Sequence, residues 1–191
     1  MPRRPSFDRD DLIDRARDVF WERGWAGTSM KDLETTLGLK PGSFYAAFGS
    51  KAKLYALALE RYAQNGQDSL ARAVKELGAL EALKQYPIRI VQSDGGGAKA
   101  CMLAKTVLEL GPQDGELAQL ASAALSKVEG LFARVFAQAQ ADGDVAACHD
   151  PARLARRYQS DLLGLRVSAE RANVDAVAIA KEMAADLDRL A

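Results

Sequence analysis

The sequence contains few of the residues from which metal sites, disulfide frameworks and catalytic triads are built. Its 191 residues include two cysteines, Cys101 and Cys148, and a single histidine, His149. Two cysteines are too few for a disulfide framework, and one cysteine with one histidine cannot alone complete a zinc site. A Ser-His-Asp triad would have to use His149, but no nucleophile-elbow motif is present. We therefore expect no enzymatic activity, no metal and no cofactor.

Long apolar runs and a surplus of one charge are also missing. No run of about 18 apolar residues occurs, so no transmembrane helix is expected. The N-terminal residues MPRRPSFDRDDL carry arginines but no apolar stretch, which excludes a signal peptide. The 26 basic and 26 acidic residues balance, which disfavours a globally basic, histone-like protein. This composition favours a reduced, soluble, cytoplasmic protein.

Strand patterns are nearly absent, and the best of them, Ile88–Val91, falls within a helical pattern. The remaining periodicity predicts an all-α chain of about nine helices. The first helix spans Arg9–Arg23, a second follows a Ser29–Asp32 capping box, a third runs from Pro41 to Phe48, and a fourth begins at Lys51. Five further helices are expected near residues 80–93, 99–111, 114–142, 151–172 and 174–190.

The second and third predicted helices meet at Gly38 and form a helix-turn-helix arrangement. A helix that reads DNA must present small or polar residues outward and keep its apolar side inward. The third helix satisfies this, because Leu39, Phe44 and Phe48 can point inward. The residues left to face outward are Pro41, Gly42, Ser43, Tyr45, Ala46 and Ala47. The stretch from Lys40 to Lys53 also holds three lysines and no acidic residue, which suits a polyanion.

Several motifs at fixed spacing across residues 8–60 resemble the TetR/AcrR family of transcriptional regulators. They are Thr28–Leu33 (TSMKDL), Leu37–Tyr45 (LGLKPGSFY), Phe48–Lys51 (FGSK) and Leu54-Tyr55. The resemblance implies an all-helical homodimer without membrane segments that binds palindromic double-stranded operator DNA. It implies a DNA-binding domain over residues 1–50. Residues 51–191 would bind a small-molecule inducer and dimerise through the last two helices.

The resemblance also implies which residues contact DNA. The family positions fall on Thr28, Lys40, Pro41, Gly42, Ser43, Tyr45, Ala46, Ala47 and Lys51. Lys51 sits at a helix N-terminus, which suits a phosphate. Ala46 and Ala47 replace the aromatic residue and the histidine or asparagine that are common in the family, and their methyl groups can touch only a thymine methyl. Arg3 and Arg4 could compensate by entering the minor groove.

The second half of the chain offers candidates for a ligand or sensor site. The stretch around Cys101 resembles the Gly-Cys-Leu segment that opens the sixth helix in a branch of TetR-like repressors, some of which sense electrophiles or oxidants through that cysteine. Tyr62, Tyr86 and Arg166 are possible cavity residues. The foremost candidates are Cys101, Lys105, Glu109, Phe132 and Tyr158.

Three functional interpretations follow. The first is a TetR-like repressor that a small-molecule inducer releases from its operator. The second is a regulator that senses oxidants or electrophiles through Cys101. The third belongs to another class, a small-molecule binding protein whose helix-turn-helix no longer reads DNA, and Ala46 and Ala47 are its only support.

Overall fold

The computed structural model describes residues 8–92, 100–111 and 115–191, and these residues form nine α-helices and no β-strand. The predicted all-α class is therefore confirmed. Residues Ile88–Val91, the best strand candidate of the sequence, lie inside helix α5 (Ala79–Gln92). A short 3₁₀ helix, Asp188–Leu190, ends the chain.

Three short helices, α1 (Arg9–Arg23), α2 (Met30–Leu37) and α3 (Pro41–Phe48), begin and end where the sequence predicts. The Ser29 side chain accepts a bond from the Asp32 amide, and the Asp32 carboxylate accepts from the Ser29 amide. These bonds from Ser29 hold the pKa of Asp32 below its usual value. Gly38 ends α2 with a left-handed backbone (φ 66°) that a side chain would strain.

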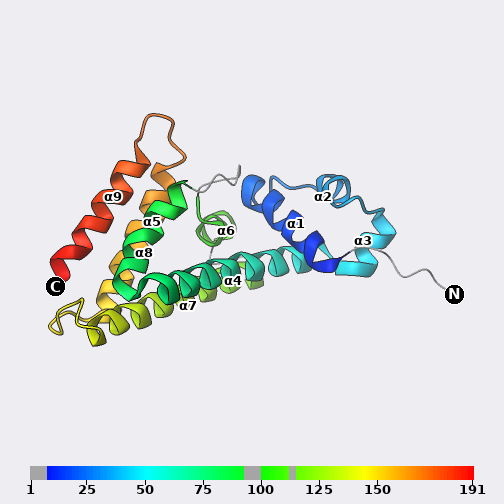
Figure 1. Cartoon of the computed structure of the whole chain (residues 1–191). Coiled ribbons are helices and arrows are strands. Elements are labelled where there is room, and N and C mark those ends of the chain that lie inside the picture. Colours follow the sequence, from blue (N-terminus) through cyan, green and yellow to red (C-terminus); the bar gives the residue numbers. More distant parts are fainter. Residues whose placement is uncertain (1–7, 93–99, 112–114) are drawn as a thin grey trace.

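Helix α4 (Lys51–Leu77) connects these three helices to the rest of the molecule, as Figure 1 shows. The Ser50 hydroxyl caps it by accepting from the Lys53 amide. The first half of α4 packs in one buried cluster with α1, α2, α3 and α6 (Met102–Leu110). Its second half packs in another cluster with α5, α7 (Gly115–Ala141), α8 (Pro151–Ser168) and α9 (Ala176–Leu187).

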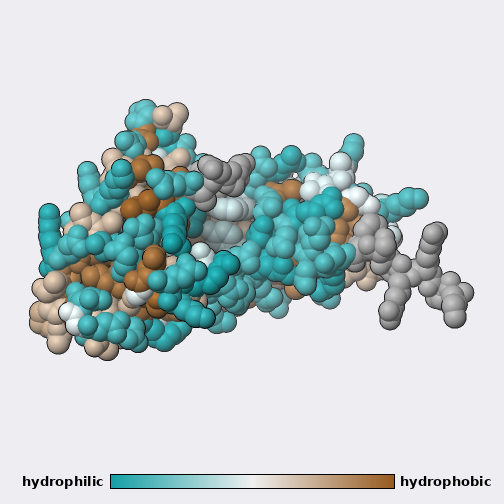
Figure 2. Space-filling view, viewed as in Figure 1, coloured by the Kyte–Doolittle hydropathy of each residue, from teal (hydrophilic) through white to brown (hydrophobic). Residues whose placement is uncertain are grey.

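The two clusters share α4, so the packing does not separate at residue 50. The domain division at residues 50 and 51 remains a prediction. Figure 2 shows apolar patches over the half of the molecule that contains α5, α8 and α9, whereas the visible face of α1–α3 is mainly hydrophilic. Within the described part of the chain, no helix combines the length and apolar character needed to span a bilayer.

A proline inside α5 creates a local requirement that α8 meets. Pro87 has no N–H, so the carbonyl of Leu83, four residues earlier, loses its partner within the helix. The buried Tyr158 hydroxyl of α8 donates to this carbonyl at 2.6 Å. Burial raises the pKa of Tyr158, which keeps the phenol protonated as a donor. The bond joins α5 to α8 at the point where α5 is weakest.

We expect Tyr158→Phe to lower the free energy of unfolding by about 1–2 kcal/mol, because it leaves a buried carbonyl unsatisfied. Urea unfolding at fixed protein concentration measures the loss. In a Pro87→Ala background the restored N–H can bond Leu83, so the same substitution should cost less there. An equal cost in both backgrounds would contradict the assignment.

Candidate nucleic-acid interface and ligand cavity

Helix α3 presents a small, polar surface to solvent. Leu39, Phe44 and Phe48 are buried as predicted, with Phe44 completely inaccessible. The Tyr45 ring is 53% exposed and packs edge-on against Phe44, which holds it in place. The other exposed residues of this surface are Lys40, Pro41, Gly42, Ser43, Ala46 and Ala47. The structure therefore brings seven of the predicted DNA-contacting residues to one exposed helix and its N-cap.

The N-terminus of α3 suits an anion. Lys40 is the N-cap residue and forms no capping bond with its side chain, so its ammonium is not used to close the helix. Pro41 occupies the first turn, and no acidic residue lies there. The unbonded N–H groups of the first turn and the positive end of the helix dipole favour negative charge.

Thr28 does not lie where the sequence predicts. Its side chain is fully buried, and its hydroxyl donates to the carbonyl of Gly24 at 2.7 Å. Ser29, not Thr28, caps α2. The Thr28 hydroxyl is therefore occupied in closing the turn between α1 and α2 and has no surface to offer a phosphate.

Lys51 also differs from its expected place. Its ammonium donates to the carbonyl of Trp25 at 2.6 Å and lies 4.1 Å from the centroid of the Trp25 ring. Burial lowers the pKa of Lys51, and the nearby Glu109 carboxylate raises it in part. The side chain thus ties the start of α4 to the turn after α1, instead of projecting outward. Arg3 and Arg4 lie outside the described residues.

Helix α6 holds the end of α1 with two opposite charges. The Lys105 ammonium donates to the carbonyls of Trp21 at 2.7 Å and Glu22 at 3.2 Å. The Glu109 carboxylate accepts from the amides of Trp25 at 2.9 Å and Ala26 at 2.7 Å. Both residues were expected as ligand contacts. The structure instead uses them to bind α6 to the last turn of α1 and to the segment that follows it.

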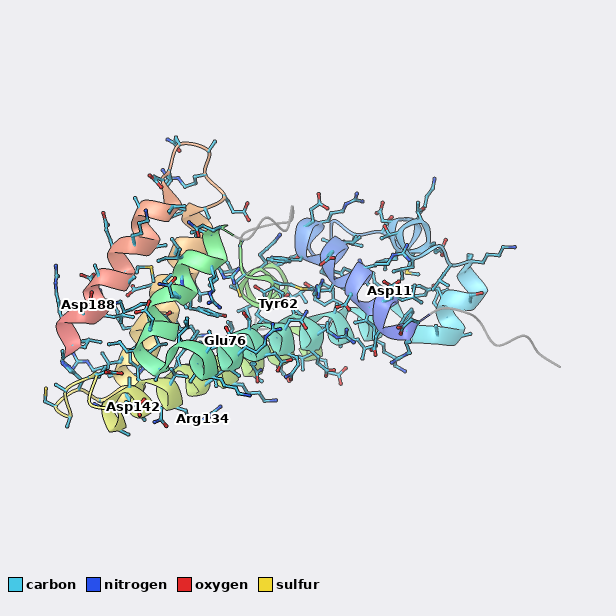
Figure 3. All side chains as sticks on the ribbon, viewed as in Figure 1. Asp11, Tyr62, Glu76, Arg134, Asp142 and Asp188 are labelled. Carbon is cyan, nitrogen blue, oxygen red and sulfur yellow. The ribbon has the colours of Figure 1, made fainter. Side chains whose placement is uncertain are left out.

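A cavity of about 420 Å³ lies between α4, α5, α6, α7, α8 and α1, and its size fits a small organic molecule. Figure 3 shows Tyr62 between α4 and α6, near the middle of the molecule. Cys101 and Phe132 line the cavity, as predicted ligand candidates. The aromatic and aliphatic wall residues are Trp21, Tyr62, Tyr86, Ile90, Leu70, Leu103, Leu125, Val128, Leu131, Phe132, Leu162 and Leu163.

Tyr158 does not line this cavity. Its ring packs edge-on against Phe132, one layer behind the wall, and its hydroxyl is bonded to Leu83. Two wall residues that the sequence analysis did not single out, Arg17 and Trp21, come from α1. The helical spacing of α1 placed its buried stripe on other residues, and no local signal marks a side chain that faces a helix from much later in the chain.

The polar groups of the cavity gather around Tyr62. Burial raises the pKa of Tyr62 well above its usual value, and the neighbouring Cys101 thiol raises it further. Burial also raises the pKa of Tyr86, which a hydrogen bond to Arg166 lowers in part. Both phenols are therefore protonated near neutral pH. Among the described residues, no group of three or more histidine, cysteine, aspartate or glutamate side chains is placed to hold a metal ion.

A helix-turn-helix with an exposed third helix, carried beside a cavity of ligand size, defines a DNA-binding regulator. The family model described as "Bacterial regulatory proteins, tetR family" matches residues 12–58. The TetR family transcriptional regulator CifR, solved as a mutant with three cysteines replaced and in complex with 26-base-pair double-stranded operator DNA, is 30% identical. That match covers 96% of this chain and 98% of CifR, with a TM-score of 0.82.

Curated relatives agree. The HTH-type transcriptional repressor ComR of Escherichia coli K12 is 26% identical over 167 residues, which cover 85% of this chain and 80% of ComR. The uncharacterized HTH-type transcriptional regulator YezE of Bacillus subtilis is 28% identical over 194 residues, covering 100% of this chain and 94% of YezE. The chain belongs to the TetR family and is a DNA-binding transcriptional regulator, not an enzyme.

We expect Lys51→Met to destabilise the protein by about 1 kcal/mol, because the Trp25 carbonyl and ring lose their cationic partner. The same variant should leave the salt dependence of DNA binding unchanged, because the ammonium faces the turn after α1. Urea unfolding and binding titrations over a range of salt concentrations measure the two effects. A salt slope reduced by about one unit would return Lys51 to the phosphate contacts.

Proposed function

We propose that the protein is a homodimeric repressor that a small molecule, bound in the cavity, releases from a palindromic operator. One observation carries this proposal: Arg17 and Trp21 of α1 form part of the cavity wall. A ligand in the cavity therefore touches the same helix against which α2 and α3 are positioned. Because the protein acts on DNA, we place it in the cytoplasm.

The proposed DNA contacts come from α3 and its N-cap. Lys40 would neutralise a phosphate, and Ser43 and Tyr45 offer hydroxyls to a phosphate or a base edge. Gly42 lets the backbone approach closely, since an added Cβ would meet nothing within 4 Å. Pro41, Ala46 and Ala47 complete the surface, with apolar contacts to thymine methyls. Arg3 and Arg4 remain candidates for the minor groove. We omit the side chains of Thr28 and Lys51.

Dimerisation is proposed through α8 and α9. Along α8 the exposed residues Ser160, Gly164 and Val167 form one outward face, and Val167 is 61% exposed. Nothing lies within 4 Å of a Cβ added at Gly164, so this face has room for the close approach of another helix. Two copies joined there would present two α3 helices to half-sites roughly 34–36 Å apart.

Release requires that the inducer prefer a conformation that does not fit the operator. Trp21 connects the two events, because its ring lines the cavity while its carbonyl accepts from Lys105. Its indole N–H also donates to the carbonyl of Ala100, which directly precedes Cys101. A ligand that displaces the Trp21 ring would therefore shift the contact between α1 and α6, and the α3 helices of the dimer would leave their groove spacing.

We expect Lys40→Ala to weaken binding to DNA upstream of the protein's own gene on all sequences and to reduce the salt slope by about one unit. The measurement is a gel shift or anisotropy titration at several salt concentrations, with Lys51→Met as the matched lysine control. The absence of any specific, salt-dependent binding to operator DNA would instead favour the small-molecule binding protein without DNA readout.

A second candidate is a thiol switch at Cys101. The observation that favours it is the position of this half-buried thiol, on the cavity wall and at the N-cap of α6. A covalent adduct on the sulfur would occupy the cavity and press on the helix that holds α1. Cys148, the other cysteine, is exposed and belongs to the loop between α7 and α8.

For a ligand-released repressor we expect Cys101→Ser to keep its response to inducer and to lose at most a several-fold part of its sensitivity, because serine preserves the volume of the side chain. Gel shifts with a mild thiol oxidant and with a non-covalent inducer distinguish the candidates. Cys148→Ser is the matched control. Release by oxidant alone, abolished by Cys101→Ser and not by Cys148→Ser, would establish the thiol switch.

A further inference from the structure

The polar groups of the cavity are hydrogen-bond donors and cations, whereas its acidic complement is missing. Two arginines, Arg17 and Arg166, line it, and no aspartate or glutamate is among the described wall residues. Arg17 is already neutralised, because its guanidinium lies 2.8 Å from the Asp14 carboxylate and 2.7 Å from that of Asp18. Arg166 bonds the phenol oxygen of Tyr86 through one of its five N–H donors.

The Tyr62 hydroxyl is the group whose chemistry the fold leaves unfinished. It is buried and has no hydrogen-bond partner in the structure. Its polar neighbours are the Cys101 thiol, Tyr86 and the Arg166 guanidinium. A buried hydroxyl without a partner costs on the order of 1–3 kcal/mol in a folded protein, so its presence in a cavity indicates a ligand atom that accepts its proton in a hydrogen bond.

The rest of the wall defines the body of such a ligand. The Trp21 and Tyr62 rings meet edge to face at 5.2 Å, and the Tyr86 and Phe132 rings do so at 5.6 Å. Leucine, isoleucine and valine side chains fill the wall between these pairs. Aromatic edges and faces arranged in this way pack well against another aromatic ring.

We propose that the cavity binds a small organic acid with an aromatic body, whose carboxylate accepts hydrogen bonds from the Tyr62 hydroxyl and the Arg166 guanidinium. Such a head group has only acceptors, which matches the donors around it, and its charge makes both bonds stronger than neutral ones. An ammonium head group would place like charges together and would leave the Tyr62 proton without an acceptor. This ligand class rests on the proposed function of the cavity as the inducer site.

The test is a direct binding measurement without DNA. In a Trp25→Phe background Trp21 is the only tryptophan of the full-length chain, so its fluorescence reports occupation of the cavity wall. The probes are phenylalkanoates from phenylacetate to phenylhexanoate, each compared with its own amide and its own amine. Calorimetry on the unmodified protein supplies a second readout. We expect the best carboxylate to bind at least about tenfold more tightly than its amide, and the amine not to bind.

Three variants assign the preference to named groups. Arg166→Gln should abolish the preference for the carboxylate over the amide, and Arg166→Lys should restore part of it because the charge returns. Tyr62→Phe should reduce the preference several-fold while it keeps the ring that packs on Trp21. Arg17→Gln is the matched control, since this arginine of the same wall is already paired with Asp14 and Asp18, and it should leave the preference unchanged.

Two outcomes would overturn the proposal: an amide or amine that binds as tightly as its carboxylate, or a series in which no carboxylate binds. A gel shift with the tightest carboxylate then tests the proposed function separately. Carboxylate binding that depends on Arg166 without release of the operator would uphold the ligand class and refute the role of the cavity as an inducer site.

Discussion

The contact on which the arrangement of the molecule depends is the one between α6 and the end of α1. A helix C-terminus exposes carbonyls without partners and the negative end of its dipole, and Lys105 of α6 meets both. Glu109, one turn further along α6, accepts from the amides of Trp25 and Ala26 just beyond that end. Because α2 and α3 follow directly from this segment, the two side chains fix where the DNA-facing helix lies relative to the larger part of the protein.

The cavity adjoins the same contact instead of lying at a distance from it. Cys101 lines the cavity and precedes the first residue of α6. Trp21 contributes its ring to the wall, its indole N–H to the Ala100 carbonyl and its own carbonyl to Lys105. Communication between the cavity and α3 therefore needs no long chain of intermediate residues. It passes through one aromatic side chain and the backbone to which that side chain is attached.

The sequence predicted what local chemistry determines. The Ser29 capping box, the left-handed Gly38 and Pro41 in a first turn depend on neighbours within a few residues, and the bounds of α1–α3 follow from them. Thr28, Lys51, Lys105 and Glu109 were misplaced because their partners lie elsewhere in the fold, 84 residues away for Lys105 and Trp21. Tyr158 illustrates the same limit: its position depends on a carbonyl that Pro87 leaves unbonded in another helix. The resemblance to a family located the DNA-facing helix, but the cavity needed side chains from six helices at once.

Part of the cavity wall belongs to α1, and in a regulator released by a cavity ligand this has a reciprocal thermodynamic effect. Whatever factor the ligand removes from operator affinity, the operator must remove from ligand affinity, because both describe one coupling free energy. Dimers free in solution would then fill with ligand at lower concentrations than dimers seated on DNA. The unbound pool would act as a ligand buffer, so the threshold for derepression would rise with the number of regulator copies in the cell.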